Sequence, residues 1–307
     1  IEFVDRELGY NEKTSRFKMS LILYNSYIKY KLNSMKKILL KVYNKIKTLV
    51  KIILGIPISK LDPKTIEKKE LLKKERFKAG ISNYFGFDMH YVDAPTFVHG
   101  GHEIIEKCIY EFKPKIEDPL IIDCGANIGL ATLYFKKAFP KAKIIAFEPD
   151  PVICSTLKKN LEINSFEDVK VEQKAVWIHS DGVKFRTEGA FSGRIPKDMD
   201  KDKINFVESI SLKEIINEPV QFLKLDIEGA ENEVIFDIES KLKFVENLFI
   251  EYHSYYNEEQ KLPEILQLLK RKGFRIHIQE AFVREKPFID KETCLGMDLQ
   301  LNIYCNR

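Results

Sequence analysis

Polar residues and glycines follow directly after an apolar run near the middle of the chain. Residues 120–135 read LIIDCGANIGLATLYF, in which Asp123 ends the run and Gly125, Asn127 and Gly129 form a turn before a segment with helical spacing. A strand that enters a helix through such a turn presents backbone N–H groups to a nucleotide-like ligand. Dinucleotide-binding turns need a glycine where this chain has Asn127. The turn therefore favours a smaller group, such as the amino-acid end of S-adenosylmethionine.

A carboxylate at the end of the next apolar run fits the same ligand. Glu148 closes the segment IIAFEP. A carboxylate in that position can accept hydrogen bonds from both ribose hydroxyls of an adenosine moiety. NAD enzymes use this position too, so an NAD-dependent enzyme stays an alternative, which Asn127 disfavours. A purely structural alternative is that the glycines only make the turn and Glu148 only ends a strand.

Two further segments carry residues that can take a proton or bind a cation. LDIEG contains Asp226 and Glu228, and EYH contains Glu251 and His253. Among these catalytic candidates His253 is the natural general base, because the unperturbed pKa of histidine lies near neutrality. The same carboxylates and imidazole can also bind a divalent cation, although we predict no metal ligand from the sequence.

The acidic residues and the histidine also have structural interpretations. Asp226, Glu228 and Glu231 open a predicted helix, whose first turn acidic side chains stabilise by capping and through the helix dipole. A histidine that ends a strand, such as His253, is often a hydrogen-bonded structural residue.

Alternating strands and helices must position these residues. Strands are predicted at 120–123, 142–149, 169–177, 182–188, 220–229, 245–253, 274–279 and 299–305, and helices at 128–139, 151–164, 211–217, 230–239 and 262–273. Alternating βα units predict a mostly parallel sheet covered by helices on both faces. The last two strands have no helix between them, so one strand of the sheet is predicted to be antiparallel. The candidate residues then lie at the ends of neighbouring strands, where open α/β sheets bind ligands.

The amino-terminal part of the chain has a different charge from the rest. Residues 1–80 carry 20 Lys and Arg against 8 Asp and Glu, while the remainder carries 30 against 38. No acidic residue occurs in 19–60, where apolar residues recur at spacings of three and four among lysines. This pattern predicts a basic amphipathic helix that binds an anionic membrane surface, or that packs on the main domain or on a second copy. A second charged helix is predicted from Pro63 to a stop at Gly80.

Cysteine usage and hydropathy indicate the compartment. The five cysteines include no CxxC pair. An odd number without such pairs argues against a disulfide framework or a zinc site. No apolar run approaches the about 18 residues needed to span a bilayer. We therefore expect a cytoplasmic protein, with peripheral membrane contact only through the basic segment.

The motifs in their order resemble the FkbM family of S-adenosylmethionine-dependent methyltransferases. The segments IDCGANIGLATLYF, IIAFEPDP, LKKNLEIN, ISLKEII and LKLDIEGAENEV carry this resemblance, which covers roughly residues 118–254. It implies a class I methyltransferase fold, which is a Rossmann-like α/β fold with a seven-stranded sheet and a reversed last strand. It also implies S-adenosyl-L-methionine as cofactor. The residues that would bind it are Asp123, Gly125, Asn127 and Gly129 around the methionine part, Glu148 on the ribose, Ala175 and Val176 beside the adenine, and Asp226 facing the sulfonium and the acceptor.

These observations lead to one functional prediction and, besides the NAD-dependent enzyme named above, two alternatives. We expect an O-methyltransferase acting on a sugar, glycan or natural-product hydroxyl. The first alternative is a catalytically inert domain that binds S-adenosylmethionine and recruits a partner through its basic segment. The second is a nucleic-acid methyltransferase, which the net acidic main domain disfavours. The expected organisation is a helical extension at 1–80, a lead-in segment at 81–117 that contributes to the substrate cleft, and a methyltransferase domain at 118–307. The loops 186–204 and 280–297 are expected to line the same cleft.

Overall fold

The computed structural model describes residues 63–186, 204–282, 286–289 and 296–307. The predicted basic helix within 19–60 lies outside these described residues. The chain divides into two compact units, Ile1–Ile66 and Glu67–Arg307. The second unit carries every candidate site residue, and it is described by itself below.

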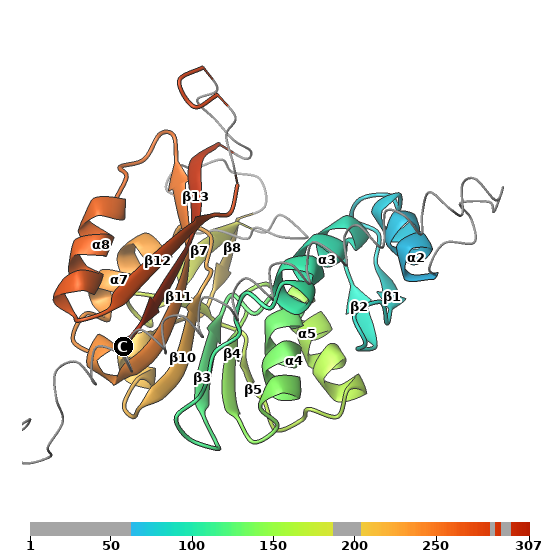
Figure 1. Cartoon of the computed structure of the whole chain (residues 1–307), viewed down its shortest axis with the longest axis horizontal. Helices are drawn as coiled ribbons and strands as arrows, with labels where there is room; N and C mark the ends of the chain where they lie inside the picture. Colours follow the sequence, from blue (N-terminus) through green and yellow to red (C-terminus); the bar gives the residue numbers. More distant parts are fainter. Residues whose placement is uncertain (1–62, 187–203, 283–285, 290–295) are drawn as a thin grey trace, which may run out of the picture. The chain divides into compact units, whose positions relative to one another are not determined.

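A seven-stranded sheet forms the centre of this unit (Figure 1). Its strand order is β12-β13-β11-β10-β3-β4-β5, and only β13 runs against its neighbours. Its strands are β3 (Leu120–Cys124), β4 (Lys143–Phe147), β5 (Lys170–Glu172), β10 (Val220–Leu225), β11 (Val245–Tyr255), β12 (Arg275–Glu280) and β13 (Met297–Asn306). The predicted class I methyltransferase sheet, with its one antiparallel strand, is confirmed.

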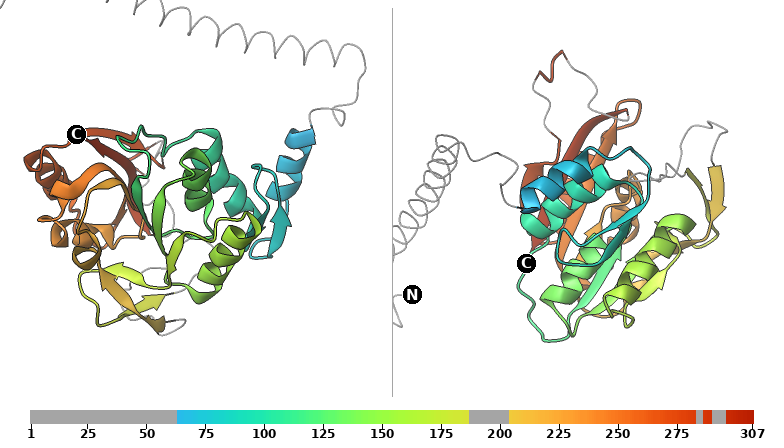
Figure 2. Two further views of the ribbon diagram at one scale, coloured as in Figure 1. Left: turned by 90° about the horizontal axis from the view of Figure 1, so that it is seen from below. Right: turned by 90° about the vertical axis from the view of Figure 1, so that its right-hand side faces the viewer.

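Helices cover both faces of the sheet, as two views show (Figure 2). On one face lie α3 (Ala94–Gly101), α4 (Leu130–Ala138) and α5 (Pro151–Ile163), and on the other lie α6 (Leu212–Ile215), α7 (Glu231–Asp237) and α8 (Leu262–Arg271). Successive strand residues point to opposite faces, so Ile121 packs in the core under α4 and α5 while Ile122 packs in the core under α7 and α8. Strands buried on both faces read as continuous apolar runs, which is why the sequence revealed them.

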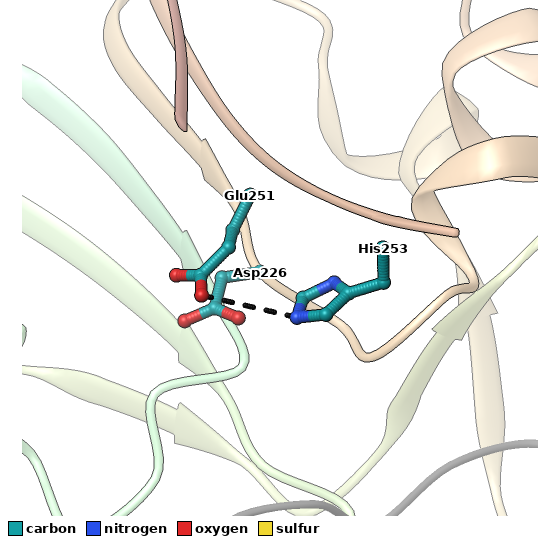
Figure 3. A group of neighbouring side chains, drawn as sticks. All are labelled: Asp226, Glu251 and His253. Carbon is teal, nitrogen blue, oxygen red and sulfur yellow. Dashed lines mark ion pairs between the residues drawn. The ribbon is translucent and has the colours of Figure 1, made fainter. Parts of the chain in front are cut away.

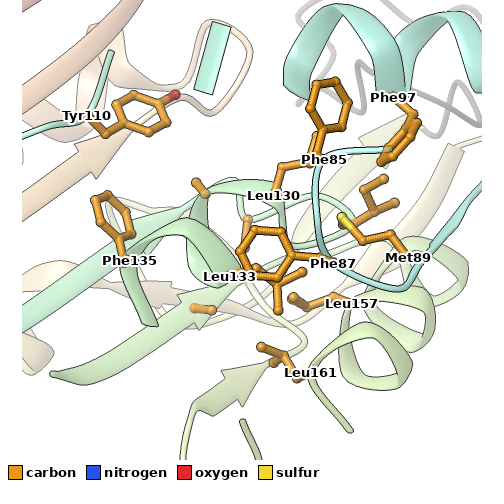
Figure 4. Packing of buried hydrophobic residues seen from close by; sticks show 14 of the residues in the cluster. Phe85, Phe87, Met89, Phe97, Tyr110, Leu130, Leu133, Phe135, Leu157 and Leu161 are labelled. Atoms are coloured by element: carbon orange, nitrogen blue, oxygen red, sulfur yellow. The ribbon is translucent and has the colours of Figure 1, made fainter. Parts of the chain in front are cut away.

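The lead-in segment packs on the α4–α5 face through aromatic side chains (Figure 4). It contains β1 (Gly80–Ser82), β2 (Met89–Tyr91), α3 and a π-helical turn at His102–Glu106. Phe85 lies 5.1 Å from Phe97, and Tyr110 lies 4.8 Å from Phe249, measured between ring centroids. The lead-in segment is therefore part of the core of the domain.

Two predicted elements differ from the structure. The helix α2 (Pro63–Leu72) ends well before Gly80, which instead begins β1. The Asp93 carboxylate accepts hydrogen bonds from Arg76 Nε at 2.9 Å and from the Phe77 backbone N–H at 2.7 Å, and these bonds hold the chain in a turn.

The predicted strand 169–177 is split into two. Its first part is β5, and its second part, β6 (Ala175–Trp177), leaves the sheet to pair with β9 (Ser209–Ser211). A third pair joins β7 (Val183–Arg186) to β8 (Ile204–Val207). Among the described residues, no helix is long and apolar enough to cross a membrane.

Candidate active site

The predicted glycine turn follows β3 and lies against the end of β10. Gly125, Asn127 and Gly129 all have positive φ, at +80°, +51° and +97°. A Cβ added to Gly125 would lie 1.8 Å from the backbone oxygen of Asp226. Only glycine fits there, so the close approach of these two strand ends depends on it.

Glu148 lies over the same turn. Its Oε2 accepts a hydrogen bond from the Asn127 backbone N–H at 3.0 Å, and its Oε1 accepts one from the Asp150 N–H at 3.0 Å. Burial raises the pKa of Glu148 to about 7, although the hydrogen bonds from the two backbone N–H groups lower it in part. Each carboxylate oxygen retains a lone pair for a further donor. The two features predicted to bind one cofactor are therefore adjacent.

A buried lysine connects the turn to the catalytic candidates, and the sequence analysis did not identify it. The side chain of Lys224 on β10 is 2 % exposed, and its Nζ lies 3.3 Å from Asp123 Oδ1 and 3.1 Å from Asp226 Oδ2. It also donates to the Gly125 carbonyl at 2.9 Å. Burial lowers the pKa of Lys224, but Asp226 and Asp123 together raise it well above its usual value. The sequence signal was a lysine inside the apolar run VQFLKL.

Asp123 lies beneath the turn and is fully buried. Its Oδ2 accepts a hydrogen bond from Thr132 Oγ1 at 2.7 Å, and its Oδ1 faces Lys224. Asp123 therefore connects the end of β3 to α4 through Thr132 and to Lys224 of β10.

Catalytic candidates converge at the carboxyl ends of β10 and β11 (Figure 3). His253 Nε2 lies 3.6 Å from Glu228 Oε2 and 3.8 Å from Glu251 Oε1. Its Nδ1 lies 3.0 Å from Glu231 Oε1. That oxygen also accepts a bond from the His253 backbone N–H at 2.8 Å. Glu231 is therefore more than an acidic residue in a first helical turn, because it orients the imidazole.

The group of four carboxylates and one imidazole, Asp226, Glu228, Glu231, Glu251 and His253, is called the acid cluster below. Burial raises the pKa of Glu228 to about 8 and that of Glu251 to about 7, with further increases from neighbouring carboxylates. Burial lowers the pKa of His253, but Glu231 and Glu228 raise it well above its ordinary value. Two carboxyl groups of the acid cluster, those of Glu228 and Glu251, therefore have pKa values near neutrality, the range that suits general acid–base chemistry.

The structure places the remaining predicted residues as follows. Ala175 and Val176 lie on β6, both are buried, and the Ala175 N–H donates to the Glu208 carbonyl at 2.9 Å. From the lead-in segment, the Tyr110 ring centroid lies 6.0 Å from Lys224 Nζ. Most of the two loops expected to line the cleft, namely 187–203, 283–285 and 290–295, lies outside the described residues.

The lead-in segment also borders a cavity of about 650 Å³ beside α5. Ile81 and His90 line it together with Ser155 and Lys159 of α5. None of the predicted site residues lines this cavity, so it is separate from the acid cluster.

The residues around the turn fit S-adenosylmethionine. Gly129, which precedes α4, provides no side-chain cap for the helix, so N–H groups at this end can bind the carboxylate of an amino acid. Glu148 has acceptor capacity for two ribose hydroxyls, and Asp226 is the member of the acid cluster that lies against the turn.

Comparison with known proteins gives the same family. The model of the "Methyltransferase FkbM domain" matches residues 123–276. The chain is 29% identical over 215 residues to "Methyltransferase sdnD" of Sordaria araneosa, covering 57% of this chain and 80% of that protein. It is 26% identical over 205 residues to "Methyltransferase 1" of Beauveria bassiana, covering 57% and 79%. It is 26% identical over 175 residues to "2-O-methyltransferase NoeI" of Sinorhizobium fredii, covering 50% and 71%.

The matched region runs from Asp123 at the start of the turn through the acid cluster to β12. It thus contains both the predicted cofactor residues and the catalytic candidates. The chain belongs to the FkbM family of S-adenosylmethionine-dependent methyltransferases.

Proposed function

We propose that this methyltransferase methylates a hydroxyl oxygen of a sugar, glycan or natural-product acceptor. The observation that carries the proposal is the position of the acid cluster beside the cofactor turn. Gly125 lets the turn contact the Asp226 backbone, and Lys224 bridges Asp123 to the Asp226 carboxylate. A group of carboxylates beside a methyl donor suits an acceptor that must lose a proton. The relative named a 2-O-methyltransferase supports oxygen as the acceptor atom.

Each part of the site has a proposed role. The turn residues Gly125, Asn127 and Gly129 and the start of α4 hold the amino-acid end of the cofactor. Glu148 accepts the ribose hydroxyls, and Ala175 and Val176 flank the adenine. When bound, the cofactor supplies an electrophilic methyl group on a sulfonium.

The acid cluster acts on the acceptor. Asp226 and Glu251, which are 25% and 21% exposed, orient the hydroxyl group in line with the methyl carbon. The acceptor oxygen bonds to the methyl carbon as the carbon–sulfur bond breaks, and the electron pair of that bond stays on sulfur. The hydroxyl proton passes to the acid cluster, in which Glu228 and His253 lie beside those two carboxylates.

A direct test combines turnover with cofactor binding. The full chain is incubated with S-adenosylmethionine and a panel of sugars and hydroxylated natural products, and mass spectrometry detects the transferred methyl group. We expect methylated acceptor together with S-adenosylhomocysteine. Calorimetry with S-adenosylhomocysteine shows independently whether the cofactor site forms. Binding without turnover of any acceptor would favour the inert-domain alternative, and a thermal shift with NADH instead would favour an NAD enzyme.

We also propose a cytoplasmic location and a contact surface on the basic segment 19–60. Its lysines and apolar stripe suit either an anionic membrane surface or a partner surface on this chain or a second copy. The two partners differ in salt dependence, because only the charge-driven membrane contact is strongly weakened by salt.

A further inference from the structure

Three side chains from the ends of two neighbouring strands, β10 and β11, converge on one point in the acid cluster. Asp226, Glu251 and His253 each offer one ligand atom, and these atoms all lie within 4.8 Å of one another. In Figure 3 the two carboxylates face the Nε2 edge of the imidazole. Two carboxylates and one imidazole form a donor set for a hard to borderline divalent cation, such as Mg²⁺ or Mn²⁺.

The imidazole is held as metal-binding histidines are held. Its side chain is 2% exposed, and its Nδ1 lies 3.0 Å from the fully buried carboxylate of Glu231. A carboxylate on one ring nitrogen fixes the ring so that the other nitrogen can bind a metal. Among the described residues, the polar neighbours recorded for that other nitrogen, Nε2, are Gln300 at 3.5 Å, Glu228 at 3.6 Å and Glu251 at 3.8 Å. These contacts are long for hydrogen bonds, so a buried and oriented nitrogen faces the carboxylates at distances that leave room for a cation between them.

Among the described residues, carboxylates outnumber basic groups in this region. The carboxylates in contact here are Asp123, Asp226, Glu228, Glu231 and Glu251, whereas the basic groups are Lys224 and His253. Buried charges are stable only when they are paired or bound to metal ions. Either protons or a cation must therefore compensate the excess of carboxylates.

We propose that Asp226, Glu251 and His253 Nε2 bind one divalent cation of the Mg²⁺ or Mn²⁺ class. Cations of this class prefer about six ligands, so three protein ligands leave positions for two adjacent oxygens of an acceptor. The role in the acceptor step rests on the proposed O-methylation, whereas cation binding itself does not. The acceptor class that this site favours is a vicinal diol or a hydroxyl beside a carbonyl group.

A bound cation would take over part of the activation of the acceptor hydroxyl group. A metal ion acidifies a hydroxyl group bound to it, which reduces the demand on a general base. Glu228 lies 3.6 Å from His253 Nε2 but is not one of the three ligands, so it borders the proposed site without belonging to it.

The test measures binding of Mn²⁺ alone to the full chain, by electron paramagnetic resonance and by calorimetry in two buffers of different ionisation enthalpy. We expect one bound Mn²⁺ that Mg²⁺ displaces, with release of protons. Asp226→Asn and Glu251→Gln should each weaken binding at least about tenfold. Glu233→Gln is the matched control, because Glu233 lies on α7 and pairs with Lys261 outside the ligand set. Its affinity should stay within about twofold of the parent.

The parent protein decides the outcome even if a variant is unstable. Absence of Mn²⁺ binding up to about 1 mM, or unchanged affinity in folded Asp226→Asn and Glu251→Gln, would overturn the inference. Calorimetry with S-adenosylhomocysteine in the presence of a chelator separates this failure from failure of the proposed function. Cofactor binding and methyl transfer without any cation would leave the methyltransferase proposal intact and remove only the metal site.

Discussion

Cofactor affinity should depend on pH through Glu148. This carboxyl group is 7% exposed, and burial raises its pKa to about 7. Ribose hydroxyls that donate to it favour the ionised form, so the pKa in the complex must lie lower. The affinity for the cofactor should therefore be highest at pH values above the pKa that Glu148 has without cofactor. It should fall as the pH drops below that pKa, because Glu148 must then lose a proton before the cofactor binds well.

The size of the effect follows from the fraction of ionised carboxylate. About nine-tenths of Glu148 is ionised one pH unit above its pKa, and about one-tenth is ionised one unit below it. The affinity for S-adenosylhomocysteine should therefore fall about tenfold between pH 8 and pH 6. Near pH 7, binding should release about half a proton, which calorimetry in two buffers measures directly.

Two variants isolate this contribution. Glu148→Gln cannot ionise, and it should bind about 10- to 100-fold more weakly at pH 8, in line with the loss of about 1.5–3 kcal/mol from hydrogen bonds to a charged group. The affinity of Glu148→Gln should not show the tenfold change between pH 8 and pH 6. Subtracting its pH profile from that of the parent removes the contributions of the ligand and of other titrating groups. Glu162→Gln, at an exposed position of α5, should behave as the parent. A parent affinity constant within twofold from pH 6 to pH 8 would refute the assignment of Glu148 to the ribose.

Three further predictions concern the lysine, the acid cluster and the basic segment. Lys224→Met leaves the fully buried Asp123 without its positively charged partner, so it should lower the free energy of unfolding by about 3–5 kcal/mol in denaturant titrations. Lys213→Met is the control: it breaks a more exposed ion pair and should lower the free energy of unfolding by less than about 1 kcal/mol. Asp226→Asn should reduce kcat about 10²–10⁴-fold while affinity for S-adenosylhomocysteine changes little, and full activity would exclude Asp226 from catalysis. Co-sedimentation with anionic and neutral vesicles, with and without residues 1–60, tests the basic segment. Binding to anionic vesicles at low salt that is lost at high salt supports contact with a membrane surface. No binding to anionic vesicles at low salt supports packing on this chain or self-association.

Most of the sheet could be predicted because its signals are local. The strands are apolar runs bounded by turn residues, and their alternation with helices indicates a mostly parallel sheet. The strand 169–177 was predicted as one element because β5 and β6 are separated only by Gln173 and Lys174. Its division depends on pairing with β9, which lies more than 30 residues away along the chain. A short segment carries no information about such a distant partner.

The site could be predicted only in part, for a related reason. The residue types in the turn and in DIEG indicated a cofactor and an acceptor, and the turn lies next to Asp226 through Gly125. Lys224 and Glu231 were not assigned to the site, because each fits an ordinary local pattern. Lysine is tolerated near the end of a strand, and glutamate is favoured in the first turn of a helix. What distinguishes them is complete burial against partners from other strands, which depends on the three-dimensional fold.

Four residues that break local rules lie at one edge of the sheet, while others, such as Phe77 and Ser165 with positive φ, lie elsewhere. Asn127 and Glu228 hold left-handed backbone conformations that cost energy for residues with a side chain. Lys224 and Glu148 are charged groups placed where burial is unfavourable. Glycine at the two left-handed positions and an apolar residue at the two buried positions would avoid these costs. The strained and buried polar positions at the carboxyl ends of β3, β4 and β10 surround the cofactor turn and the acid cluster, so ligand binding explains them better than stability does.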